Sequence, residues 1–201
     1  MTYPCAVVLA AGYGRRFRAQ GGVGPHKLLM PCTGLDGSLR PVLEHTLASL
    51  GHWPGERLLV IRQGSDERER FGELARRHGF ATLAVPSAGM GDSLSASVRA
   101  RPEASGWLVL LGDMPWIRPQ TLDQVTAALA HHPIAVPVYQ GQRGHPVGFA
   151  ASQRAGLERL SGDVGARQLL SQPGVAWVEV ADPGVVRDVD VPADLSGVNQ
   201  R

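Results

Sequence analysis

The stretch that decides the fold is Cys5-Ala6-Val7-Val8-Leu9-Ala10-Ala11-Gly12-Tyr13-Gly14. It begins as a short, continuous apolar run and ends as a turn of small residues. An apolar run that stops at a glycine-rich turn is typical of a parallel β-strand buried on both faces. Small residues after such a strand let the backbone approach a ligand closely, and their N–H groups can bind phosphate oxygens. The stretch therefore predicts a parallel sheet with a ligand-binding turn, although a plain tight turn fits the glycine spacing equally well.

Similar apolar runs recur along the chain, and segments with helical spacing of apolar residues separate them. The further runs cover residues 57–61, 81–85, 107–111, 134–139 and 175–180. The helical stripes cover residues 43–50, 71–78 and 122–129. Pro137 predicts that its run forms an edge or bulged strand, because proline lacks the N–H that a central strand donates. Strands that alternate with helices predict a layered α/β fold with a mostly parallel sheet.

Individual residues mark the ends of the predicted helices. Asp66 is expected to cap the second helix, and Gly79 is expected to end it. Pro119 suits the first turn of the third helix, where its missing N–H costs nothing. Gly89 and Gly91 are expected to open another helix, whose N-terminus could face an anion.

Composition and charge limit the class of protein. The chain has 201 residues, of which 43% are hydrophobic and 19% are charged, so it can form one domain with a real core. We expect residues 1–201 to form a single domain with a frayed tail at 196–201, because neither a repeat nor a linker divides the chain. A formal net charge of +2 is too small to indicate a nucleic-acid surface.

Neither the cysteines nor the apolar runs indicate secretion or a membrane. Cys5 lies in the first predicted strand and is expected to be a small core residue, and Cys32 shares no metal-binding spacing with it. No run approaches the roughly 20 apolar residues that a membrane-spanning helix needs. Nothing resembles a signal peptide. The expected location is the reducing cytoplasm.

Carboxylates after predicted strands are the main candidates for chemistry. Asp113 directly follows one predicted strand, and α/β sheets bind ligands at the carboxyl ends of their strands. Asp188 and Asp190 alternate in an extended segment and should share one face, where a cation would offset their repulsion. Carboxylate oxygens are the ligands that Mg²⁺ prefers. A turn or helix cap remains the alternative for Asp113, and a solvated strand edge remains the alternative for the pair.

Other polar residues could contact phosphates or a second substrate. Arg16 and Lys27 follow the glycine turn and offer cations for a triphosphate. His145 is either a substrate contact or a turn residue bonded to the backbone. Arg167 is either a phosphate partner or an ordinary surface arginine.

Taken in order, the motifs resemble those of the molybdenum-cofactor nucleotidyltransferases, in particular the cytidylyltransferase branch. The resemblance covers residues 5–195 and rests on seven short motifs. They are Leu-Ala-Ala-Gly-x-Gly-x-Arg-Phe from Leu9, Lys-Leu-Leu-x-Pro from Lys27, Gly-Met-Gly-x-Ser-Leu from Gly89, Gly-Asp-Met-Pro from Gly112, Gly-His-Pro-Val from Gly144, Gly-Asp-x-Gly-Ala-Arg from Gly162 and Asp-Val-Asp-x-Pro-x-Asp-Leu from Asp188.

The resemblance implies a three-layer α/β/α sandwich, of the kind shared with sugar-nucleotide transferases. It also implies transfer of a nucleoside monophosphate from an NTP to a phosphorylated acceptor such as molybdopterin, with Mg²⁺ as cofactor and a molybdoenzyme as partner. The implied catalytic residues are Arg16, Lys27 and Asp113, and the implied metal ligands are Asp113 and Asp190. The implied nucleotide-binding residues are Leu9, Ala10, Ala11, Gly12, Gly14, Arg16, Lys27 and Ser93. The implied residues for the second substrate are His145, Asp163 and Arg167.

Some positions bear on which substrates are used. Ala11 favours CTP, because the guanylyltransferase branch usually has glycine there. The family usually has glycine where this chain has Arg18, a shorter interval before Lys27, and often serine in place of Asp92. A carboxylate beside an anionic acceptor would be unfavourable, so Asp92 is expected to point away unless the acceptor differs. The alternatives are a guanylyl- or sugar-1-phosphate transferase, and a non-catalytic module that binds or chaperones a cofactor.

Overall fold

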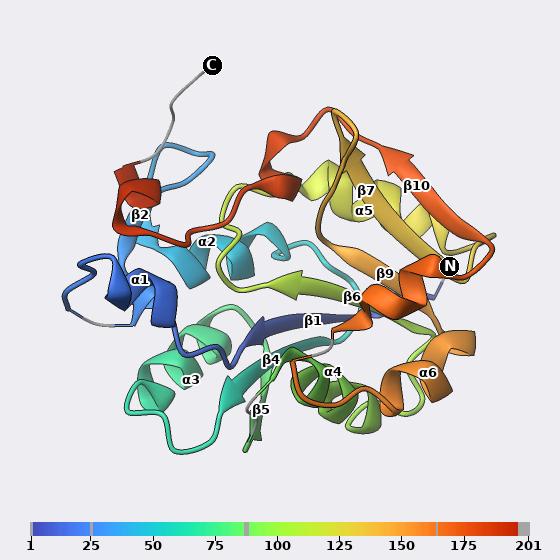
Figure 1. Ribbon diagram of the computed structural model, residues 1–201, viewed down its shortest axis with the longest axis horizontal. Coiled ribbons are helices and arrows are strands. Elements are labelled where there is room, and N and C mark those ends of the chain that lie inside the picture. The colour runs from blue at the N-terminus through green and yellow to red at the C-terminus, as the bar shows by residue number, and fades with distance from the viewer. Residues whose placement is uncertain (1, 25, 87–88, 164, 197–201) are drawn as a thin grey trace.

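A computed structural model of the protein describes residues 2–24, 26–86, 89–163 and 165–196. The strands of its large sheet are β1 (Cys5–Ala10), β4 (Arg57–Arg62), β5 (Ala81–Val85), β6 (Gly106–Leu111), β7 (Ile134–Tyr139), β8 (Gln142–Arg143), β9 (Val147–Ala150) and β10 (Val175–Glu179). A small second sheet pairs β2 (Pro31–Thr33) with β3 (Leu39–Pro41). The order in the large sheet is β10-β7-β9-β6-β1-β4-β5 (Figure 1). The short strand β8 pairs with β7.

Helices cover both faces of the large sheet. The α-helices are α1 (Arg15–Ala19), α2 (Val42–Ser49), α3 (Arg68–Arg77), α4 (Met90–Arg99), α5 (Pro119–Ala128) and α6 (Arg154–Glu158). Short 3-10 helices are η1 (Lys27–Leu29), η2 (Ala151–Gln153), η3 (Ala166–Ser171), η4 (Pro183–Val186) and η5 (Pro192–Ser196). Buried side chains of α2, α3 and α5 pack on one face of the sheet, and those of α4 and α6 pack on the other. The predicted three-layer α/β/α sandwich is confirmed.

The centre of the sheet positions the ends of two strands side by side. β1 lies between β4 and β6 and is parallel to both. Val7 and Val8 are fully buried, and burying a side chain of this size stabilises the fold by roughly 1.5–3 kcal/mol. In the register, Leu9 on β1 lies opposite Leu111 on β6. The turn after β1 and the loop after β6 therefore leave the sheet at the same edge.

Of the two forms predicted for the run with Pro137, an edge strand or a bulged strand, the edge strand is wrong. β7 has β10 on one side and both β9 and β8 on the other. Pro137 is tolerated because it falls where the antiparallel partner changes, with Ala135 paired to β9 and Val138 paired to β8. Its carbonyl still accepts a hydrogen bond from the N–H of Gly144 at 2.9 Å. The four-residue strand β9, which the sequence did not indicate, supplies the antiparallel element between β6 and β7.

The predicted helix ends are confirmed with one exception. Gly79 follows the end of α3 with a φ of 70°, Pro119 is the first residue of α5, and Gly89 precedes α4. Asp66 does not cap α3, which begins two residues later, and Ser65 there accepts the N–H of Glu67. The Ser65 hydroxyl also donates to the Glu67 carboxylate, and Glu67, the residue before α3, makes no side-chain cap bond.

Two sequence expectations concern the chain ends and membranes. The expected frayed tail at 196–201 lies outside the described residues except for Ser196, which is the last residue of η5. Within the described ranges, no helix combines the length and the apolar character needed to cross a membrane.

Candidate active site

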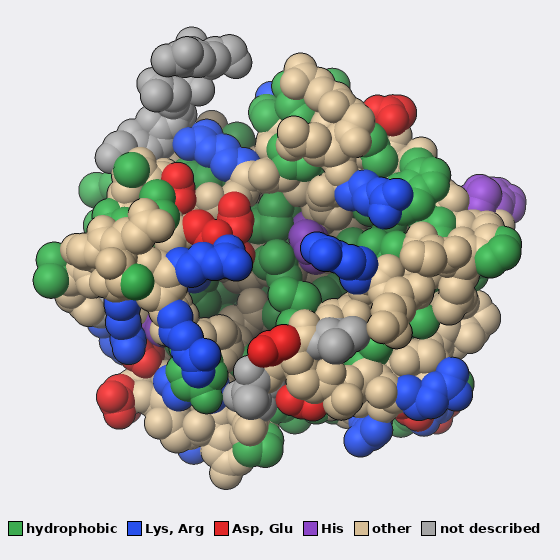
Figure 2. All heavy atoms as spheres, in the orientation of Figure 1, with side chains coloured by type: hydrophobic (Ala, Val, Ile, Leu, Met, Phe, Trp, Pro, Cys, Tyr) green, Lys and Arg blue, Asp and Glu red, His purple; other side chains and the backbone are tan. Residues whose placement is uncertain are grey.

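A cleft of about 370 Å³ opens at the carboxyl ends of β1 and β6. Its walls come from the turn after β1, the start of α4 and the segment before η5. The lining residues are Leu9 to Phe17, His26, Lys27, Leu28, Gly89, Met90, Ser93, Leu111, Asp113, Asp163 and Asp190. Figure 2 shows this face of the molecule hollowed near its middle, with acidic and basic side chains gathered along one side of the hollow. The cleft therefore lies where α/β sheets bind their ligands.

The glycine turn is open toward the cleft and fixed on its inner side. Gly14 has a φ of 61° just before α1, a conformation that glycine adopts without strain. A Cβ atom added to Gly12 would meet no protein atom within 4 Å. The Gly12 carbonyl lies 2.9 Å from Nε2 of His26, and Phe17 anchors α1 in the core. Packing leaves the backbone of this turn accessible to a ligand.

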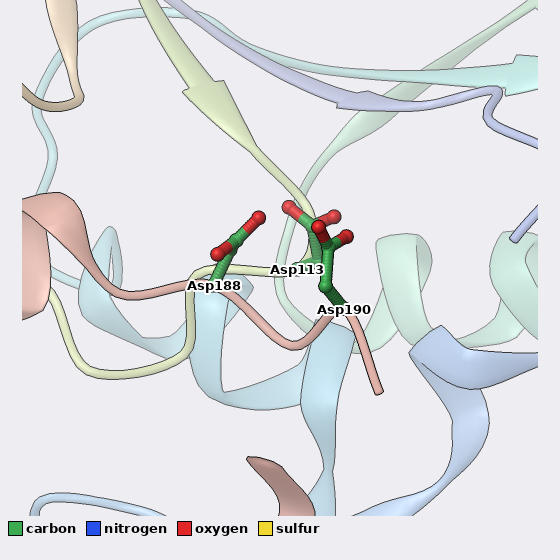
Figure 3. Close-up of side chains that lie close together, drawn as sticks. All are labelled: Asp113, Asp188 and Asp190. Carbon is green, nitrogen blue, oxygen red and sulfur yellow. The ribbon is translucent and has the colours of Figure 1, made fainter. Parts of the chain in front are cut away.

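A cluster of three carboxylates lies beside the turn. Asp113 comes from the loop after β6, whereas Asp188 and Asp190 come from the extended segment before η5 (Figure 3). One oxygen of each residue lies within 4.8 Å of the others. Val189 between them is fully buried, and its N–H donates to the Asp113 carbonyl at 2.9 Å. Alternation puts both carboxylates of this segment on one face, as predicted, and the structure turns that face toward Asp113.

Two cations contact the carboxylate cluster. Lys27 Nζ lies 2.7 Å from Asp113 Oδ2, 2.9 Å from the Val189 carbonyl and 3.5 Å from Asp190 Oδ1. Arg16 donates to Asp190 Oδ2 at 2.9 Å. The long interval between Arg16 and Lys27 does not displace the lysine, because η1 returns it to the cleft.

The charges of the cluster are not balanced. Among the described residues, three carboxylates face two cations. Burial, together with the charges of Asp190 and Asp113, raises the pKa of Asp188 above its ordinary value. Burial would also raise the pKa of Asp190, but the Arg16 hydrogen bond and the Lys27 charge outweigh it and hold that pKa low. Asp113 Oδ1 is buried and has no hydrogen-bond partner among the described residues. These groups have the capacity to bind a further cation.

Of the remaining predicted site residues, two line the cleft and two do not. Asp163 and Ser93 line it. His145 is half-buried, its Nδ1 lies 3.4 Å from the Val109 carbonyl, and burial lowers its pKa. Arg167 is exposed on η3. In the part of the chain that the structure describes, neither His145 nor Arg167 lines the cleft.

Asp92 points away from the cleft toward a neighbouring turn. Its Oδ1 accepts the N–H of Gly162 at 3.0 Å, and the N–H of Gly91 donates to the Gly162 carbonyl at 2.8 Å. These two bonds hold the start of α4 against the turn that carries Asp163. The Asp92 carboxylate, which stands where the family often has serine, therefore binds the backbone of the protein and does not face the cleft.

Sequence reasoning missed two residues of this site. Alternation pairs Asp188 with Asp190, but the motif resemblance implies only Asp190 as a metal ligand. His26 lies in the interval before Lys27, to which the sequence gives no role. A histidine directly before the lysine was the available signal, but nothing in the sequence indicated that it would return to the glycine turn.

The fold and the cleft define a class of protein, the nucleotidyltransferases with a glycine turn at the end of the first parallel strand. A family model described as the MobA-like NTP transferase domain matches residues 6–177. The chain belongs to the MobA-like NTP transferase family.

Individual relatives agree with this assignment. The bifunctional protein GlmU of Syntrophotalea carbinolica is 31% identical over 157 residues, which cover 77% of this chain and 32% of that protein. The chain spans about a third of the length of the curated relatives it matches. Among solved structures, Rv0371c of Mycobacterium tuberculosis H37Rv is 27% identical with a TM-score of 0.77, covering 96% of both chains. Its complex with manganese is 26% identical with a TM-score of 0.70, covering 98% of this chain and 94% of that one.

Proposed function

We propose that the protein transfers CMP from CTP to a phosphorylated small molecule, with a pterin cofactor as the favoured acceptor, and releases pyrophosphate. The observation that carries the proposal concerns the carboxylate oxygen Oδ1 of Asp113. This oxygen is buried and unpaired among the described residues, and it belongs to a carboxylate cluster that borders the glycine turn. A buried carboxylate oxygen without a partner is costly unless a ligand binds it.

The carboxylates of Asp113, Asp188 and Asp190 would hold Mg²⁺. All three offer the oxygen ligands that this hard cation prefers. The manganese complex of Rv0371c supports a divalent cation in a related protein. When bound, the cation would neutralise charge on the phosphate that undergoes transfer.

The residues of the chain would act by positioning and by charge neutralisation. The backbone of the turn at 10–14 would hold the nucleotide, and Lys27 and Arg16 would offset the charge of the triphosphate. The stem of Lys27 already borders the turn, since its Cγ lies 3.7 Å from the Cβ position of Gly14. Both side chains, Lys27 and Arg16, already line the cleft.

The chemical step needs no nucleophile from the protein. An oxygen of the acceptor phosphate attacks the α-phosphorus of the NTP and forms the new P–O bond. The bond from the α-phosphorus to the bridging oxygen breaks, and pyrophosphate leaves with that electron pair. Holding both substrates in line is the main contribution of the cleft.

Nucleotide binding and pyrophosphate release together test the proposal. The melting temperature is measured with CTP, GTP, ATP and UTP, each with and without Mg²⁺, because a ligand that binds the native state stabilises it. Pyrophosphate release is then followed with molybdopterin and with sugar 1-phosphates. CTP with Mg²⁺ should give the largest shift, and molybdopterin should give turnover. A GTP preference would instead indicate a guanylyltransferase, and pterin binding without any NTP turnover would indicate a binding module.

A further inference from the structure

His26 lies directly beneath the glycine turn. Only 4% of its surface is exposed, although histidine is a polar residue. Its ring packs edge-on against Phe71, with ring centroids 5.5 Å apart and planes at 90°. Its Nε2 atom lies 2.9 Å from the Gly12 carbonyl. A buried polar ring with one nitrogen aimed at the turn has a fixed orientation.

The second ring nitrogen defines the tautomer. The N–H of Leu28 donates to Nδ1 of His26 at 3.3 Å. A nitrogen that accepts a hydrogen bond carries no proton, so the proton of the neutral ring is on Nε2, which donates to Gly12. Burial lowers the pKa of His26 and favours this neutral form, and the charges of Arg18 and Lys27 act in the same direction. The hydrogen bond to Gly12 and the charge of Glu67 act in the opposite direction but do not outweigh burial.

The bond to Gly12 orients the next peptide N–H. In a trans peptide unit the C=O and N–H groups point in opposite directions. Because the Gly12 carbonyl points to His26, the N–H of Tyr13 points away from that buried ring. Tyr13 lines the cleft, and among the described residues no protein acceptor is found for its N–H. This N–H is therefore available to an anionic ligand.

We propose that His26 is a positioning residue, which fixes the Gly12–Tyr13 peptide unit so that its N–H faces a phosphate of the bound nucleotide. The proposal rests on the proposed function, because it requires the turn to bind an NTP. Gly12 has no side chain, and a Cβ atom at its position would meet no protein atom within 4 Å. If the ring of His26 were removed, little else would therefore limit rotation of the Gly12–Tyr13 peptide unit. The effect should therefore fall on nucleotide affinity and not on the chemical step.

Three variants separate the two hydrogen bonds of the ring. His26→Gln keeps an N–H donor near the place of Nε2, His26→Asn keeps only an acceptor near the place of Nδ1, and His26→Ala keeps neither. We expect the KM for CTP to rise about tenfold in the Asn and Ala variants, with kcat changed by less than about threefold. In the Gln variant the KM should stay within about threefold of the original value.

His45 provides a matched control. It is also buried, with 6% exposed, and its Nε2 lies 2.9 Å from a backbone carbonyl, that of Cys32. His45 does not line the cleft in the described part of the chain. His45→Asn should lower the melting temperature as His26→Asn does, but it should leave the KM for CTP unchanged.

Backbone order parameters from nuclear magnetic resonance relaxation give a second readout that does not need turnover. The order parameter of the Tyr13 amide should fall from about 0.85 to below about 0.6 in His26→Asn, and it should be unchanged in His45→Asn. An unchanged order parameter in His26→Asn, or equal KM changes in the His26 and His45 variants, would overturn the role of His26. If the unsubstituted protein bound no NTP while the order parameter at Tyr13 still fell in His26→Asn, the proposed function would fail and the control of the turn by His26 would stand.

Discussion

The two walls of the cleft are built in different ways. The turn wall consists of residues 9–17, Lys27, Asp113 and Asp190. On the α4 wall, Gly89, Met90, Ser93 and Asp163 line the cleft, and Asp92 and Gly162 join the two segments that carry them. Side chains from separate segments connect the turn wall, through His26 to Gly12, Lys27 to Asp113 and Arg16 to Asp190. Lys27 makes three of these side-chain contacts, whereas the exposed Arg16 makes one among the described residues.

The α4 wall depends mainly on backbone contacts. Gly162 exchanges two hydrogen bonds with the start of α4, one with the N–H of Gly91 and one with the Asp92 carboxylate. A Cβ atom on Gly89 would lie 2.0 Å from the Gly162 carbonyl, so the two segments touch where only glycine fits. Among the described residues, the Asp92 carboxylate supplies the main side-chain hydrogen bond between the start of α4 and the turn at Gly162.

This difference suggests that the two walls have separate functional roles. The turn wall carries the charges that the proposed NTP and its cation would need, and one of them, Asp113, follows the central strand β6. The α4 wall is made of loop and helix-end residues, which vary more easily without loss of the fold. We therefore expect the turn wall to set the reaction and the α4 wall to set the acceptor.

The largest expected effect is at Asp113 on the turn wall. Asp113→Asn keeps the shape of the side chain and an oxygen for Lys27, but it removes a charge from the proposed cation site. Turnover, measured as pyrophosphate release with CTP and the acceptor, should fall about 10³-fold. Asp123→Asn, at an exposed position of α5, is the control and should retain full activity. Activity of Asp113→Asn within tenfold of the original would remove the metal role.

A smaller effect is expected at Asp92 on the α4 wall. Asp92→Ala removes the acceptor for the Gly162 N–H and should raise the KM for the acceptor about fivefold, equivalent to about 1 kcal/mol for one hydrogen bond. The KM for CTP should not change. Asp92→Asn retains an oxygen in the same place and should behave like the unsubstituted protein. If the KM for CTP rose as much as the KM for the acceptor, the two walls would not have separate roles.

The turn wall was also the more predictable of the two from sequence. The apolar run before Gly12 and the run before Asp113 each indicated a buried strand, and parallel strands that end together place their loops together. Alternation was enough to put Asp188 and Asp190 on one side. The motifs of the α4 wall were visible, but the contact between Asp92 and Gly162 joins segments 70 residues apart, and no local pattern encodes it.

The errors in the fold have the same origin. Pro137 obeys the rule that proline avoids regular pairing, but the change of partner from β9 to β8 satisfies that rule within the sheet. Asp66 has a suitable side chain for a helix cap, but Glu67 is the residue before α3 and no side-chain cap bond forms there. The change of strand partner and the exact start of the helix are both details that the residue types alone did not decide.

The smallest expected effect concerns Mg²⁺ binding in variants of the two cations of the turn wall, one mostly buried and one exposed. The side chain of Lys27 is 12% exposed and bonded to Asp113, whereas that of Arg16 is 81% exposed. A cation that enters the cluster must compete with the buried ammonium, while solvent screens the guanidinium. In Lys27→Met, the rise in melting temperature caused by Mg²⁺ should exceed that of the unsubstituted protein by about 3 °C, as expected for roughly tenfold tighter binding.

Arg16→Met is the matched comparison, since it removes the other cation of the same cluster. Its Mg²⁺-dependent rise in melting temperature should stay within about 1 °C of the original, because an exposed ion pair contributes little. Differential scanning fluorimetry over a range of Mg²⁺ concentrations measures both variants. Equal shifts in the two variants would mean that burial of Lys27 does not control access to the carboxylates. A weaker Mg²⁺ effect in Lys27→Met than in the unsubstituted protein would mean that the lysine organises the cation site and does not compete for it.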